Sequence, residues 1–181
     1  MLAVVNTADL CASLAELLDY PSAELTDKIR ICREKLSSQH PEVSASIEEF
    51  LASVSELPQD VLEETYTRTF DMAPICVPYV TSYIYGQESF DRGKLMSGLA
   101  EAYSRIGFET GGELPDHIGL LLRFAPFLDQ DELADLIQYC LREPVGEMVQ
   151  SLQNANSPYA PLMRAIQLAV GAQSVQETDH D

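Results

Sequence analysis

The sequence predicts an all-α protein, a single-domain bundle of about eight to ten helices. Apolar residues recur at intervals of three and four along most of the chain, which places them on one face of a helix, and the strict alternation typical of strands is missing. The chain has 181 residues, 46% of them hydrophobic and 22% charged, as an ordinary globular domain has. No repeat or linker divides it. We therefore expect one helical domain over residues 1–172 and a frayed acidic tail over 173–181.

Four helices are expected in the first seventy residues. The first follows a cap at Thr7 or Asp9, and the second follows a cap at Ser22. The third begins at Pro41 and the fourth after Pro58, because proline is tolerated in the first turn of a helix.

The middle of the chain departs from this pattern. Residues 71–87 contain two prolines, three tyrosines and few charges, which predicts a loop and then a short, distorted helix. Ser89 or Asp91 is expected to cap the next helix, which ends at Gly107, since glycine readily adopts the left-handed conformation that closes helices. We expect this helix to be central in the fold.

The last part of the chain predicts a glycine-bearing turn, a buried helix and three further helices. Gly111 and Gly112 favour the turn, and Pro115 and Asp116 suit the start of the buried helix. The later helices are expected at about residues 130–141, 144–153 and 158–172.

Charge and cysteine usage exclude several classes of function. The net charge of -18 repels nucleic acid and anionic lipids; it attracts cationic peptides, although it also simply favours solubility. The four cysteines and three histidines are scattered, so we expect no metal site. Cys11, Cys32 and Cys140 lie among apolar residues at helical spacing and are expected to be buried, reduced thiols, as in a reducing cytoplasm. The first residues lack the pattern of a signal peptide, and no run of 18 apolar residues occurs.

The residues also indicate binding rather than catalysis. No phosphate-binding glycine motif is present, and Asp116 and His117, as neighbours on a helix, would point about 100° apart. A neutral histidine at a helix start can instead contact a ligand. Pro78, Tyr79 and Tyr83 are consistent either with core packing or with the lining of a peptide groove. We expect no catalytic residue, metal or cofactor.

Three stretches carry a resemblance to a known family. They are LAELLDYP at 14–21, EETYTRTFD at 63–71 and DRGKLMSGLAEAYSRIGFETGGELPDHIGLLLRFAPFL at 91–128, the last being the most specific. Together they resemble the TorD/DmsD/NarJ family of redox-enzyme maturation chaperones, most closely its NarJ-type branch, the nitrate reductase delta-subunit chaperones. The segment APICVPYVTSYIYG at 73–86 is more similar to the TorD/DmsD side, which leaves the client open.

The resemblance implies a cytoplasmic, non-catalytic chaperone. Such proteins bind the N-terminal segment, often a twin-arginine signal, of a molybdenum-containing oxidoreductase subunit, and assist cofactor insertion and assembly before export or membrane docking. A permanent structural or assembly subunit of a respiratory complex is the alternative. The chain is expected to be a monomer, or a dimer that exchanges elements through the loop at Gly111 and Gly112.

The family's peptide-binding motif and groove map onto specific residues of this sequence. We expect the client's arginines to pair with Asp116 and Glu113, and its apolar part to lie near Tyr79, Tyr83 and His117. The full set of expected client-binding residues is Phe70, Pro78, Tyr79, Tyr83, Glu113, Pro115, Asp116 and His117.

Overall fold

The all-α class is confirmed by the computed structural model, which describes residues 5–85 and 89–172. Within these residues the chain forms α-helices and no strand, and the expected tail at 173–181 lies outside them. The helices are α1 (Thr7–Ala15), α2 (Leu25–Leu36), α3 (Pro41–Val54), α4 (Gln59–Phe70), α5 (Thr81–Ile84), α6 (Phe90–Ile106), α7 (Ile118–Phe124), α8 (Gln130–Asp135), α9 (Arg142–Asn154) and α10 (Ala160–Gly171). Short 3₁₀ turns, Glu16–Leu18 and Ala125–Phe127, follow α1 and α7.

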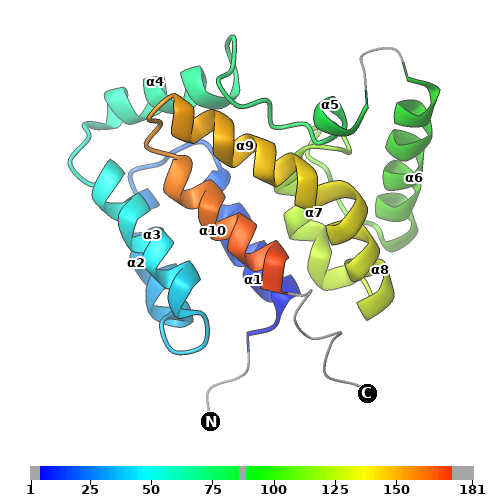
Figure 1. Ribbon diagram of the computed structural model, residues 1–181, viewed down its shortest axis with the longest axis horizontal. Helices are drawn as coiled ribbons and strands as arrows, with labels where there is room; N and C mark the ends of the chain where they lie inside the picture. Colours follow the sequence, from blue (N-terminus) through cyan, green and yellow to red (C-terminus); the bar gives the residue numbers. More distant parts are fainter. Residues whose placement is uncertain (1–4, 86–88, 173–181) are drawn as a thin grey trace.

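Helix α10 lies at the centre of the bundle (Figure 1). It packs against α3, α9 and α1, and α1 in turn packs against α7. The apolar residues on its inner face recur at helical spacing and are buried, Leu162 and Ile166 among them. A single cluster of buried side chains therefore runs from α1 to α10 and forms the core of the described chain.

The expected helix starts in the first half are correct to within a few residues. Asn6 caps α1 in place of Thr7 or Asp9, since its side chain accepts a hydrogen bond of 2.8 Å from the backbone N–H of Asp9. Ser22 lies in the turn before α2 rather than at its cap. Helix α3 begins at Pro41 as expected, and α4 begins directly after its proline.

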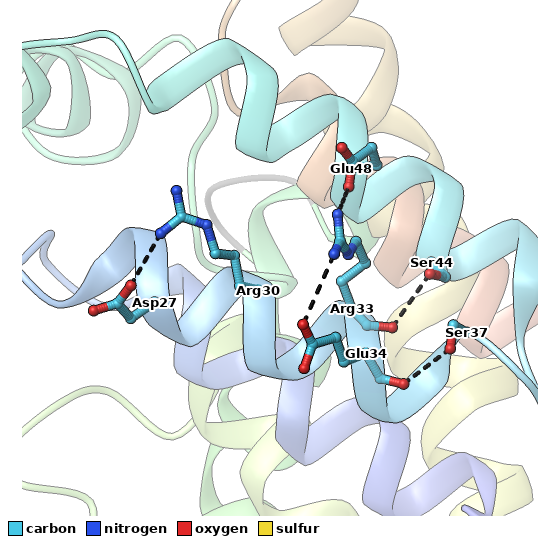
Figure 2. A network of polar contacts seen from close by, with 7 residues as sticks. All are labelled: Asp27, Arg30, Arg33, Glu34, Ser37, Ser44 and Glu48. Carbon is cyan, nitrogen blue, oxygen red and sulfur yellow. Dashed lines mark hydrogen bonds and ion pairs between the residues drawn. The ribbon is translucent and has the colours of Figure 1, made fainter.

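Helices α2 and α3 are joined on their exposed side by a polar network (Figure 2). Arg33 pairs with Glu48 across the two helices and lies 3.9 Å from Glu34 on its own helix. The Ser44 hydroxyl donates to the carbonyl of Arg33 at 3.3 Å. Because these groups are partly solvated, their ion pairs and hydrogen bonds contribute little to the free energy of unfolding. The stability comes from the buried faces of both helices.

The expectation that the helix ending at Gly107 is central is wrong. Helix α6 stands at one edge of the molecule (Figure 1), and of its residues only Leu99 and Tyr103 are buried. The apolar stripe of α6 is narrow, so only one face of the helix packs against the rest of the protein. Phe90, at the start of the helix, is 81% exposed. The predicted ending is confirmed, since Gly107 has a φ of 70°.

The two helices expected at about residues 130–141 and 144–153 follow each other without a break in helical structure. A π-helical segment, Leu136–Leu141, joins α8 to α9 without a loop. Pro144 does not interrupt the helical structure, because it falls in the first turn of α9, where its missing N–H is harmless. None of the helices in the described parts of the chain has the length and apolarity to cross a bilayer.

All four cysteines are free and buried, which confirms the burial predicted for Cys11, Cys32 and Cys140 and adds Cys76. Burial raises the pKa of Cys11 to about 12 and that of Cys140 to about 11. At neutral pH these thiols stay protonated and unreactive.

Leu121 of α7 is fully buried, and its replacement tests the core. We expect Leu121→Ala to lower the free energy of unfolding by about 2 to 5 kcal/mol, because it leaves a cavity beside α1. Ile31→Ala, at a site that is 66% exposed on α2, should change it by less than about 0.5 kcal/mol. Urea unfolding of both variants measures the difference, and equal losses would contradict the packing described.

Candidate functional site

Two segments expected to form the site meet in one antiparallel bridge. The N–H of Val80 donates to the carbonyl of Asp116 at 3.0 Å, and the N–H of Ile118 donates to the carbonyl of Pro78 at 2.8 Å. Tyr79 and His117 are thereby placed opposite each other. The bridge fixes residues from two distant parts of the sequence at one place on the surface.

The bridge also corrects the expected start of α7. Pro115 and Asp116 precede the helix, which begins at Ile118 with His117 as its cap. The reason is that the first free N–H of the helix, that of Ile118, is satisfied by the bridge rather than by a further helical turn. The hydroxyl of Tyr103, on α6, donates to the carbonyl of Pro115 at 2.7 Å and holds this approach to α7 in place.

His117 is held in its neutral form. Its Nδ1 accepts a hydrogen bond of 3.1 Å from the N–H of Gly119, and its ring lies edge-on to that of Tyr79, with centroids 5.5 Å apart. Burial lowers the pKa of His117, and the positive charge of Arg123 acts in the same direction, whereas Glu113 opposes both. A protonated Nδ1 could no longer accept from Gly119, so the cap requires the neutral ring.

Glu113 presents an oriented carboxylate at the surface. Its Oε1 accepts from the hydroxyl of Tyr79 at 3.1 Å and from the N–H of Leu114 at 2.9 Å. Burial and the neighbouring Glu113 raise the pKa of Tyr79, so this phenol remains a donor. Glu113 is exposed, and it keeps acceptor capacity for a ligand.

Asp116 lies beneath this surface rather than on it. Its side chain is fully buried, and Oδ2 accepts from both the hydroxyl and the backbone N–H of Thr81, the latter at 3.3 Å. Its Oδ1 has no hydrogen-bond partner among the described residues. The carboxylate therefore joins α7 to the start of α5, and it does not reach the solvent, where we expected it to meet a client arginine.

The remaining expected site residues lie in the core or, as Tyr83 does, pack half-buried against it. Phe70 is buried in an aromatic cluster, 5.2 Å from the rings of Tyr66 and Tyr159. Pro78 is buried within the bridge segment. Tyr83 donates its hydroxyl to the carbonyl of Val77 at 2.9 Å, and burial raises its pKa. These three side chains support the surface from below.

A pocket of about 210 Å³ opens beside the exposed part of the site. It is lined by Leu18, Asp19, Tyr20, Tyr66, Thr110, Glu113, His117, Gly119, Leu120 and Arg123. Every one of these residues falls in one of the three stretches 14–21, 63–71 and 91–128. Segments that are far apart in the sequence thus converge on a single pocket.

Several lining residues were missed by the sequence reasoning. Arg123 forms an ion pair with Asp19 and donates to the carbonyl of Ala15 at 3.3 Å. Tyr20 lies edge-on to Tyr66, with ring centroids 5.3 Å apart. Their positions within the three stretches that resemble the chaperone family were the one sequence feature that could have indicated them. The spacing of residues along the chain does not show that residues 19 and 123 meet.

The same pocket has a firm wall on its core side. The hydroxyl of Tyr66 donates to the carbonyl of Leu18 at 3.0 Å, which ties α4 to the turn after α1. Burial, together with the charges of Asp19 and Asp71, raises the pKa of Tyr66 to about 12. No group of three potential metal-ligating side chains occurs among the described residues.

The contact between Asp116 and Thr81 can be tested as a pair. We expect Asp116→Ala to lower the free energy of unfolding by about 1 to 3 kcal/mol, because it leaves the Thr81 donors buried without an acceptor. In a double-mutant cycle with Thr81→Val, measured by urea unfolding, the combined loss should be smaller than the sum. Additive losses would show that the two side chains act independently.

His117 should make stability depend on pH. Its pKa in the folded protein lies below the ordinary 6.5 of the unfolded chain, so its stabilising effect is complete above pH 6.5 and is lost as the pH falls through the lowered folded value. His117→Asn keeps a neutral capping side chain that does not titrate. The unfolding free energy of the parent, relative to this variant, should therefore fall as the pH drops below the ordinary pKa of histidine, about 6.5. A constant difference would mean that His117 does not titrate differently on folding.

Comparison with known proteins identifies the family of the chain. No curated protein matches it significantly in sequence. A solved structure from Archaeoglobus fulgidus, described as a candidate redox enzyme maturation protein, has the same fold, with a TM-score of 0.57 and 22% identity over 89% of this chain and 91% of that chain. The model of the family described as nitrate reductase delta subunit matches residues 33–165, well over half of the sequence. This match confirms the NarJ-type resemblance, and the chain belongs to the nitrate reductase delta subunit family.

Proposed function

We propose that the protein is a cytoplasmic maturation chaperone for a molybdenum-containing oxidoreductase. It binds the N-terminal segment of the catalytic subunit, often a twin-arginine signal, and assists cofactor insertion and assembly before export or membrane docking. One observation carries the proposal: the three stretches that resemble the chaperone family contribute every residue that lines the pocket beside His117.

The chemistry of this surface suits a segment that is both basic and apolar. Glu113 offers a carboxylate that Tyr79 already orients. Two apolar side chains stand beside it in solvent, since Tyr20 is 56% and Leu114 is 47% exposed. The net charge of -18 draws cationic segments toward the molecule, while the local groups select among them.

The polar groups at the site support binding rather than catalysis. His117 uses its Nδ1 to cap α7 and is not hydrogen-bonded to a nucleophile in the described structure. Asp116 is occupied with Thr81 and does not orient the histidine. The arrangement therefore lacks the nucleophile, base and orienting group that acyl or phosphoryl transfer needs.

Capture from the native host tests the proposal. Tagged protein should retain one molybdoenzyme catalytic subunit, identified by mass, and Glu113→Gln should reduce its recovery several-fold by removing the charge that meets the client's arginine. Glu101→Gln, which removes an exposed carboxylate from α6, serves as the matched control and should recover as much client as the parent.

The captured material also distinguishes a chaperone from the alternative, a permanent structural or assembly subunit of a respiratory complex. A chaperone is absent from the mature, cofactor-loaded enzyme, whereas a permanent subunit remains in it at one copy per complex. Retention in the mature enzyme would favour the structural subunit. Equal recovery by Glu113→Gln and the parent would reject the assigned surface.

A further inference from the structure

The pocket contains an ion pair whose cation comes from the protein itself. Arg123 is the one permanent cation among the described lining residues, and it pairs with Asp19. Both side chains are reached by solvent, with 32% of Arg123 and 53% of Asp19 exposed. A pair of this kind is weak and is readily exchanged for another partner, because water competes for both charges.

Arg123 also has a second hydrogen-bond acceptor besides Asp19. Its guanidinium donates to the carbonyl of Ala15, the last residue of α1, at 3.3 Å. The carbonyl end of a helix carries partial negative charge and stabilises a nearby cation. Arg123 can therefore release Asp19 and still keep a favourable contact.

We propose that Arg123 occupies, in the free protein, the place at Asp19 that an arginine of the bound segment takes in the complex. On binding, the incoming guanidinium takes Asp19 together with Glu113, and Arg123 withdraws onto the carbonyl of Ala15. This rests on the proposed function and deepens it, because it names the side chain that the pocket reads and adds Asp19 to the recognition residues.

The walls of the pocket favour a guanidinium over other groups. Tyr20 is 56% exposed and meets Tyr66 edge-on, so its ring is available for a planar cation to stack on. Both described hydrogen bonds to Glu113 end on Oε1, which leaves capacity on the carboxylate for N–H donors. The neutral ring of His117 adds no opposing charge.

The exchange also explains how an acidic pocket stays selective. With Arg123 paired to Asp19, a single free cation gains little beyond Glu113. A guest must supply enough contact to displace Arg123, which an arginine with apolar neighbours provides and a small ion does not. Arg123 thus raises the threshold for binding without blocking the pocket.

The test uses acetyl-Arg-Arg-Leu-Leu-amide as the probe, which joins arginine to apolar neighbours, with acetyl-Gln-Gln-Leu-Leu-amide as its uncharged counterpart. Binding is followed by amide chemical shifts in two-dimensional NMR of the full-length protein, with attention to Gly119 and Leu120. The parent should bind the arginine probe there and should not bind the glutamine one. Arg123→Gln should tighten binding by about two- to fivefold, the worth of one exposed ion pair.

Matched variants separate the exchange from a general effect of charge. Arg30→Gln removes one exposed cation from α2 (Figure 2), so it changes the net charge equally without touching the pocket, and it should leave the affinity of the parent unchanged. Arg123→Lys keeps a competing cation and should stay close to the parent. Asp19→Asn and Glu113→Gln should each weaken binding by a factor of two or more.

Weaker or unchanged binding by Arg123→Gln would overturn the inference, since Arg123 would then contact the guest or play no part. Shifts confined to residues away from the pocket would overturn it as well. Thermal unfolding of each variant shows whether it is folded, and Arg123→Lys provides the comparison if Arg123→Gln is not. The client capture described above is independent: if it succeeds while the probe result fails, only the exchange is rejected, and the reverse outcome rejects the chaperone.

Discussion

The pairing of Pro78 and Val80 with Asp116 and Ile118 is the constraint on which the site depends. These two backbone hydrogen bonds, 2.8 and 3.0 Å long, join a loop without regular structure to the start of α7. They bring Tyr79 beside His117, and Tyr79 in turn orients Glu113. Without the bridge, the aromatic and acidic groups would lie on separate flexible segments, and ordering them on binding would cost conformational entropy.

The buried and the exposed side chains around the bridge have different roles. Buried groups beneath it, Asp116 with Thr81 and the hydroxyl of Tyr103 on Pro115, fix the backbone. Exposed groups above it, Glu113 and Tyr20, remain free to meet a ligand. This division separates Asp116 from its neighbour His117: the aspartate is buried against Thr81, whereas the histidine caps α7 and lines the pocket.

Much of the fold could be predicted from the sequence, because helical periodicity, prolines and the glycine at 107 are local signals. The edge position of α6 could not, since the width of an apolar stripe tells how much a helix buries but not where it lies. The predicted start of α7 was wrong because the N–H of Ile118 donates to the distant carbonyl of Pro78 instead of to a preceding helical turn. In the site, Glu113, Tyr79 and His117 come together at the surface, whereas Asp19 and Arg123 depend on tertiary contacts that spacing does not reveal.

Site-directed photo-cross-linking in the native host tests the central claim most directly. A photoreactive residue at Leu114, which is 47% exposed beside Glu113, is compared with one at Ile31, which is 66% exposed on α2, a helix that contributes no residue to the pocket. We predict that the probe at 114 cross-links to the N-terminal segment of one oxidoreductase catalytic subunit and that the probe at 31 does not. Cross-links at 31 alone, or at 114 only to other parts of the client, would contradict the account.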